Sequence, residues 1–129
     1  MKYLDKYIET QRNDKIKTMP FIDYIYFIMD MKNLTPSEVY KNADIDRRTW
    51  SKIISNQMIP SLEMTVKIAI GLQLTNEECK ILLKKLNYTL SRSSDFALVI
   101  RYCLENKIYS LIKINGSVES SGVLWGHKN

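Results

Sequence analysis

Two consecutive arginines, Arg47 and Arg48, stand in the stretch DIDRRTWSKIISNQMIP, residues 44–60, directly after Asp46, a residue type that often caps helices. If Asp46 begins a helix, both arginines lie in its first turn. That turn carries unpaired N–H groups and the positive end of the helix dipole, so each cation there costs about 0.3–1 kcal/mol. An external anion offsets this cost. The position of the two arginines therefore indicates either a fully solvated helix end or the binding of an external anion.

Residue types that catalyse reactions or hold metals are sparse. His127 is the only histidine and lies in the C-terminal tail, so no Ser/His/Asp or Cys/His set forms around it. The two cysteines do not have the ligand spacing of a zinc site, and no glycine-rich phosphate loop occurs. The acidic residues are scattered singly, which gives a two-metal nuclease site no support. The sequence predicts a protein that is not an enzyme and needs no cofactor.

The composition is typical of one helical globular domain. The 129 residues are 45% hydrophobic and 26% charged, with only four Gly and three Pro. The longest apolar stretch, residues 20–31, is too short to span a bilayer and contains Asp23 and Asp30, so we expect no membrane association. No secretory signal is evident, and Cys79 and Cys103 fall at apolar positions, which favours buried thiols in the cytoplasm. The net charge of +5 suits an anionic partner.

Helix signals begin close to the N-terminus. Apolar spacing predicts a modest amphipathic helix over residues 3–12 and a second helix over residues 21–31, which Asn33 ends. Residues 13–20 are interpreted as a linker between the two. The linker ends in Pro20, a residue that is well tolerated where a helix begins.

Five helix-start signals follow, two of them capping boxes in which Thr is followed three residues later by Glu. The signals stand at Thr35, Asp46, Ser61, Thr75 and Ser94. Gly71 is interpreted as a mild flaw inside the helix that follows Ser61. Residues 108–114 fit either a strand or a short buried helix, and residues 115–121 a last short helix. The predicted fold class is all-α.

Three short motifs lie close together in the central part of the chain. A Leu-Thr pair at residues 34–35 precedes a helix, an apolar Trp50 is followed by Ser-Lys-Ile, and Pro-Ser-Leu-Glu stands at residues 60–63. In these motifs the chain resembles the XRE, or lambda-repressor-like, helix-turn-helix family of bacterial and phage regulators. The resemblance implies a five-helix domain over residues 19–90. Residues 1–18 would then form an N-terminal helix and linker, and residues 91–129 a helical C-terminal extension and tail.

The resemblance also implies a sequence-specific transcriptional regulator, such as a repressor, of a bacterium, phage or mobile element. Its recognition helix, residues 46–55, would enter the major groove of double-stranded DNA. Base-reading positions would fall on Arg47, Arg48 and Ser51, and a bidentate Arg–guanine pair contributes about 1–3 kcal/mol of discrimination. The complete set of predicted DNA-contacting residues is Ser37, Arg47, Arg48, Thr49, Ser51, Lys52, Ser55 and Asn56.

We expect a homodimer, because residues 41–74 carry only five basic against three acidic side chains and a weakly basic unit gains affinity from two half-sites. The apolar segment 96–114 either forms the dimer interface or covers the open side of the core.

The alternative function is a protein-binding module on the same fold, such as an antitoxin or a phage inhibitor of a host protein. Pro36 and Tyr40, which depart from the usual residues of the family at these positions, fit this alternative. A third interpretation has a partner or ligand acting through the C-terminal extension, although the sequence gives no sign of a small-molecule effector.

Overall fold

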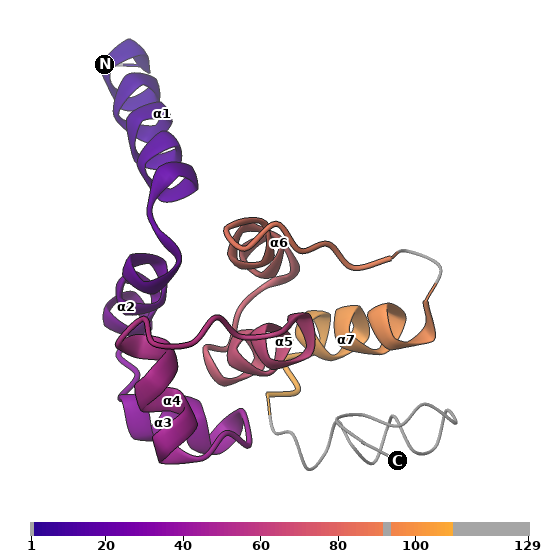
Figure 1. Ribbon diagram of the computed structural model, residues 1–129. Helices are drawn as coiled ribbons and strands as arrows, with labels where there is room; N and C mark the ends of the chain where they lie inside the picture. Colours follow the sequence, from indigo (N-terminus) through magenta and orange to yellow (C-terminus); the bar gives the residue numbers. More distant parts are fainter. Residues whose placement is uncertain (1, 92–93, 110–129) are drawn as a thin grey trace.

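The computed structural model describes residues 2–91 and 94–109, which form seven α-helices and no strand (Figure 1). The helices are α1 (Lys2–Thr18), α2 (Phe21–Lys32), α3 (Pro36–Asn42), α4 (Arg47–Ile54), α5 (Leu62–Gly71), α6 (Asn76–Lys84) and α7 (Asp95–Glu105). The all-α prediction is confirmed for this part of the chain. None of these helices is long and apolar enough to cross a membrane. The elements predicted beyond residue 109 lie outside the described residues.

Short-range hydrogen bonds set where the helices begin. A side-chain oxygen of the residue before α3, α4, α5, α6 and α7 accepts a hydrogen bond from the backbone N–H three residues later. These caps are the predicted Thr35, Asp46, Ser61, Thr75 and Ser94. Both predicted capping boxes are complete. Each cap satisfies an N–H group that the helix leaves unpaired at its N-terminus.

The first helix is longer than the sequence predicts. Residues 13–18, interpreted as a linker, are helical, so only Met19 and Pro20 separate α1 from α2. Asn13 and Asp14 are weak helix formers, but neither breaks a helix as Gly or Pro does. In Figure 1, α1 projects away from the rest of the molecule.

A lysine that is distant in sequence caps the C-terminal end of α1. The Lys85 ammonium donates to the main-chain carbonyl oxygens of Ile16 at 2.7 Å and of Met19 at 2.5 Å. It also lies 5.0 Å from the centre of the Tyr24 ring, in cation–π geometry. Helix C-termini leave carbonyl groups unpaired, and a cation at that end is favourable. Burial lowers the pKa of Lys85.

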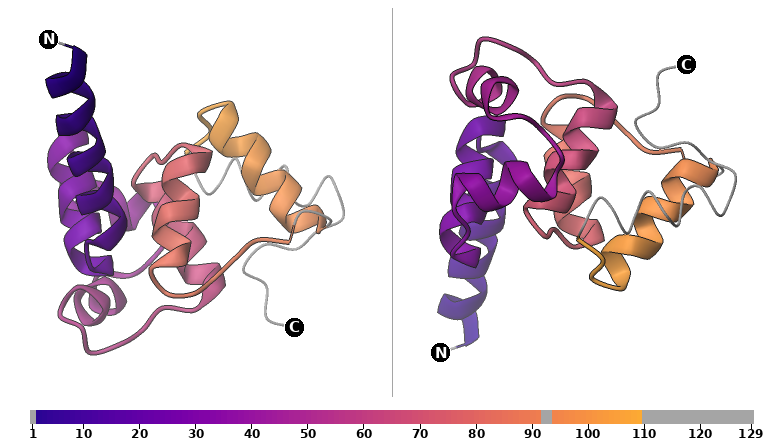
Figure 2. Two further views of the ribbon diagram at one scale, coloured as in Figure 1. Left: turned by 90° about the horizontal axis from the view of Figure 1, so that it is seen from above. Right: turned by 90° about the horizontal axis from the view of Figure 1, so that it is seen from below.

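The hydrophobic core is shared by α2 to α7. Helix α5 packs against α3 and α6, and α6 packs in turn against α7. In both views of Figure 2, α5 and α6 lie between the α2–α4 part of the molecule and α7. Ile100, Cys103 and Leu104 of α7 are buried in this core. The described part of the C-terminal extension therefore covers the core, one of the two roles that the sequence left open.

Both cysteines are free and buried, as predicted. Burial raises the pKa of the Cys79 thiol to about 12 and also raises that of Cys103. The thiolate is the reactive form of cysteine, so both side chains behave as small apolar groups in the folded protein.

Gly71 lies where α5 passes closest to α3. A Cβ atom at this position would overlap the main-chain carbonyl oxygen of Val39 and lie 3.1 Å from the Cβ of Ala43. The interpretation of Gly71 as a mild flaw is therefore wrong, because the missing side chain permits the close approach of the two helices.

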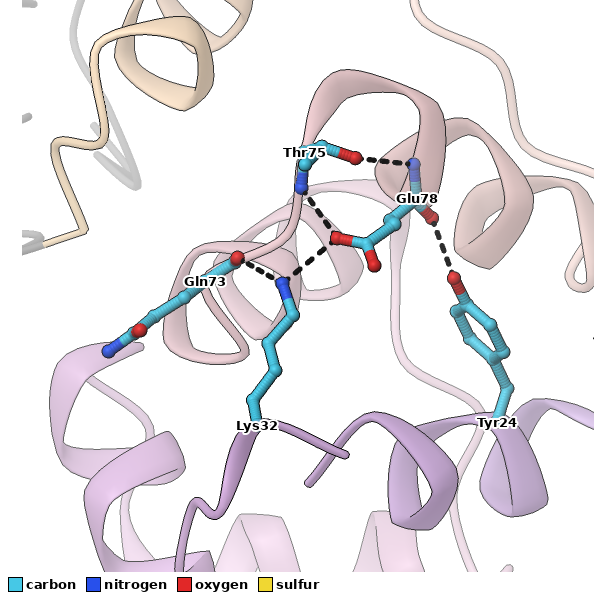
Figure 3. A network of polar contacts seen from close by, with 5 residues as sticks. All are labelled: Tyr24, Lys32, Gln73, Thr75 and Glu78. Atoms are coloured by element: carbon cyan, nitrogen blue, oxygen red, sulfur yellow. Dashed lines mark hydrogen bonds and ion pairs between the residues drawn. The ribbon is translucent and has the colours of Figure 1, made fainter. Parts of the chain in front are cut away.

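A polar network joins α2 to the start of α6 (Figure 3). The Lys32 ammonium donates to the Gln73 carbonyl oxygen at 2.5 Å and to Glu78 Oε1 at 2.9 Å. The same Glu78 oxygen accepts from the backbone N–H of Thr75 at 2.9 Å, which completes the capping box of α6. The Tyr24 hydroxyl donates to the Glu78 carbonyl oxygen at 3.5 Å. One carboxylate thus both begins α6 and fixes it to α2.

The two ion pairs among the described residues differ in burial, and we expect them to differ in energy. The Lys32–Glu78 side chains are each 22% exposed, whereas Lys80 and Glu77, 3.5 Å apart, are 65% and 82% exposed. Replacing Lys32 with alanine should lower the free energy of unfolding by about 1.5–3 kcal/mol, since hydrogen bonds to charged groups are lost. Lys80→Ala should change it by less than about 0.5 kcal/mol. Urea denaturation of both variants measures the difference, and equal effects would contradict the structural role of the network.

Candidate nucleic-acid interface

The turn between α3 and α4 is fixed at several points. Asp44 adopts a left-handed conformation with φ of 53°, as its place at the end of α3 predicts. The buried Ile45 anchors the turn in the core, and its N–H donates to the Tyr40 carbonyl oxygen at 2.9 Å. Asp46 then caps α4. The first residues of α4 are therefore held in one direction relative to α3.

Asp46 makes two hydrogen bonds to the same residue. Its Oδ1 accepts from the Thr49 N–H at 2.7 Å and its Oδ2 accepts from the Thr49 hydroxyl at 3.1 Å. These bonds lower the pKa of Asp46, first through the Thr49 N–H and hydroxyl and further through the charge of Arg48. The Thr49 hydroxyl is thus used inside the cap, although Thr49 belongs to the predicted DNA-contacting set.

The lowered pKa of Asp46 predicts a pH-dependent start of α4. A carboxylate with a lower pKa in the folded state stabilises fully above its ordinary unfolded pKa, and this stabilisation is lost as the pH falls through the folded value. The Asp46→Asn variant keeps a capping oxygen but has no charge at this position. The stabilisation that this cap gives to α4 should therefore not change over that acidic range. Thermal unfolding of both proteins between pH 7 and pH 2 measures the effect. Identical pH profiles would show that the Asp46 charge does not contribute.

Helix α4 has one buried and one exposed face. Trp50 and Ile53 are buried, and Ile54 is partly buried against the same core. The exposed residues of α4 and its C-terminal end are Arg47, Arg48, Ser51, Lys52, Ser55 and Asn56. Trp50 is a core residue, with its ring centre 6.3 Å from that of Tyr40 on α3. The cationic and hydroxyl side chains therefore face solvent together.

Most of the predicted contact residues line two adjoining surface grooves. The first groove is lined by Ser37 of α3 and by apolar side chains. Its lining also includes Arg47 and Ser51 of α4 and Ser55 at the C-terminal end of α4. Arg48 and Lys52 line the second groove, which shares Arg47 and Ser51 with the first. Neither lining contains an acidic side chain. We call this combined surface the α3–α4 face.

Two predicted residues line neither groove of the α3–α4 face. Thr49 is partly buried in the cap described above. Asn56 has a φ of 66° beyond the end of α4 and lines a different hollow, beside the start of α2. Asn56 is exposed and directly follows Ser55 in the chain, so it lies at the edge of the α3–α4 face.

Sequence reasoning missed residues that line the grooves, among them Tyr26 and Gln57. Tyr26 of α2 is 49% exposed and lines the first groove, in which Tyr40 also lies, and Gln57 lines the second. A tyrosine away from the apolar stripe of its helix was the available signal for Tyr26. Nothing local in the sequence indicates that α2 reaches the surface formed by α3 and α4.

The α3–α4 face presents cationic and hydroxyl hydrogen-bond donors, with no acidic side chain in its groove linings. Guanidinium, ammonium and hydroxyl groups donate hydrogen bonds to phosphate oxygens and base edges. Within the described residues, no group of three His, Cys, Asp or Glu side chains is placed to hold a metal ion.

The chain matches no family model, and no curated protein or solved structure is significantly similar to it.

Proposed function

We propose that the protein is a sequence-specific double-stranded DNA-binding regulator, of the bacterial or phage type, that acts in the cytoplasm. In this proposal α2 to α6 form a lambda-repressor-like domain, and α4 lies in the major groove. One observation carries the proposal: Arg47 and Arg48 are exposed at the start of α4, on a face whose groove linings contain no acidic side chain.

Each predicted DNA-contacting residue has a proposed role. Arg47 and Arg48 extend beyond the start of α4 and pair with guanine edges or with a phosphate, and Ser51 follows them one turn later. Ser37, Lys52 and Ser55 contact the DNA backbone, which sets the position of α4 in the groove. Asn56 contributes a further backbone contact at the edge of the face. Thr49 acts through the cap that positions the two arginines.

Selection from a random duplex library tests the proposal. The purified protein should enrich a defined sequence, and its affinity should fall steeply between low and moderate salt, because each neutralised phosphate releases a counterion. A folded, helical protein that enriches no sequence at low salt would refute DNA recognition.

A homodimer would place two α4 helices on half-sites about one helical turn apart. Among the exposed apolar side chains of the described residues, two groups offer surfaces for this contact: Tyr3, Leu4, Tyr7 and Ile8 on α1, and Leu98 and Tyr102 on α7. We expect the larger α1 surface to be used, so Leu4→Glu/Ile8→Glu should yield a monomer and Leu98→Glu/Tyr102→Glu should not. Sedimentation equilibrium distinguishes the two variants, and the opposite pattern would assign the dimer contact to α7.

A protein-binding function is the second candidate, and one observation favours it. The first groove is lined by Tyr26, Tyr40, Trp50 and Ile54 as well as by polar groups. Aromatic side chains are enriched in protein interfaces. A protein partner bound through this apolar part should tolerate moderate salt, whereas DNA binding should not. A pull-down repeated at two salt concentrations separates the two functions.

A further inference from the structure

A second cavity lies far from the α3–α4 face, between α6, the segment after it and α7. Its volume is about 490 Å³, within the range of roughly 300–1,000 Å³ that is typical of small-molecule sites. Cys79 and Leu83, each 2% exposed, form its most buried part. Tyr88 and Leu90 extend this apolar lining. The cavity therefore combines a buried apolar floor with an open, partly polar rim.

Three cationic residues line the same cavity. They are Lys80, Lys84 and Arg101, and no acidic residue is part of the lining. Lys80 has only the exposed Glu77 beside it, at 3.5 Å. Among the described residues, Lys84 and Arg101 have no ion pair. Lys80 and Lys84 are exposed and Arg101 is partly exposed, so the rim of the cavity presents positive charge to solvent beside the apolar wall.

Asn76 holds the two helices that form the cavity. Its side-chain amide donates to the Arg101 carbonyl oxygen at 3.4 Å and to Glu105 Oε1 at 3.0 Å. The Tyr88 hydroxyl donates to the Pro60 carbonyl oxygen at 2.9 Å, which fixes the segment after α6. The lining is thus held by contacts of its own. A preformed site reduces the ordering entropy that binding would otherwise cost.

We infer that this cavity binds a small amphipathic organic anion, with its apolar chain against Leu83 and Leu90 and its acid group beside Lys84 and Arg101. A neutral apolar molecule would leave the cations unpaired, and an inorganic anion would leave the apolar wall uncovered. Only a ligand with both parts matches both surfaces. The inference concerns a site separate from the α3–α4 face and does not depend on DNA binding.

Decanoate, a ten-carbon carboxylate, is the probe for this site. Calorimetric titration of the full chain, below the concentration at which decanoate forms micelles, should show saturable binding of one molecule per chain. Decanol, which has the same chain without the charge, should bind at least tenfold more weakly. In ¹H–¹⁵N spectra, decanoate should shift the amide signals of residues 79–90 and of Arg101 and leave those of residues 47–55 unchanged.

Charge-neutral variants locate the acid-binding part. Lys80→Gln/Lys84→Gln/Arg101→Gln should lose at least tenfold in affinity for decanoate and keep the weak binding of decanol. The matched control removes the same charge from exposed positions of α1, as Lys6→Gln/Arg12→Gln/Lys17→Gln, and should bind decanoate normally. Absence of saturable binding, equal affinity for decanoate and decanol, or an equal loss in both variants would each overturn the inference. None of these outcomes bears on DNA binding, which the duplex selection tests separately.

Discussion

Replacement of both Arg47 and Arg48 with alanine is expected to weaken binding to the selected duplex by about thirtyfold or more. One bidentate Arg–guanine pair contributes about 1–3 kcal/mol, and each 1.4 kcal/mol corresponds to a factor of about ten. Both side chains are exposed and contribute nothing to the core, so the fold should not change. Fluorescence anisotropy with a labelled duplex measures the affinity, and circular dichroism verifies the helical content.

The control for this double variant removes the same charge elsewhere. Lys6→Ala/Arg12→Ala takes two exposed cations from α1, which projects away from the α3–α4 face. Long-range electrostatic attraction should fall similarly in both variants, whereas the loss of base contacts is specific to Arg47 and Arg48. Equal affinities of the two variants would show that the arginines act only through net charge and would refute base recognition.

Substitution of Gly71 with alanine is expected to lower the free energy of unfolding by about 1–3 kcal/mol, the usual range for an overpacked core. Alanine is the better helix former by about 1 kcal/mol, so helix propensity alone predicts the opposite sign. The added methyl group would overlap the Val39 carbonyl oxygen, and a main-chain atom has no rotamer by which to move aside. Urea denaturation determines the sign.

Lys67→Ala in the same helix is the control for Gly71→Ala. Lys67 is partly exposed, and alanine there adds no atom to the contact with α3. We expect its effect to remain within about 0.5 kcal/mol, as for most surface substitutions. A Gly71→Ala protein as stable as wild type would show that α3 and α5 can separate without loss of packing.

Local chemistry explains which parts of the fold could be predicted. The caps at Thr35, Asp46 and Thr75 depend on atoms three residues apart, so the sequence contains all the partners. The left-handed Asn33 and Asp44 likewise follow from residue types that tolerate positive φ. The division of α4 into a buried and an exposed face follows from its periodicity.

Contacts between distant segments explain what could not be predicted. The length of α1 is supported by Lys85, which is far away in the chain, and the need for Gly71 comes from a carbonyl group of α3. The composition of the candidate interface depends on Tyr26, brought beside α3 and α4 only by folding. The cavity between α6 and α7 likewise joins Lys84 to Arg101 across the segment that separates the two helices. Sequence periodicity shows which face of each helix is buried, but it does not show which other helix that face contacts.

The lysine cap on α1 has a consequence for the order in which the chain acquires its structure during synthesis. Ile16 and Lys85 are separated by 69 residues, so the ribosome must add this length after making α1 before the contact exists. At about 5–20 residues per second, that interval is on the order of 3–14 s. Throughout it the nascent α1 lacks the Lys85 cap, and Tyr3, Leu4 and Tyr7, which are also exposed in the folded protein, can contact other molecules. Helix α1 is therefore available to a chaperone or to a neighbouring nascent chain before its C-terminal end is fixed.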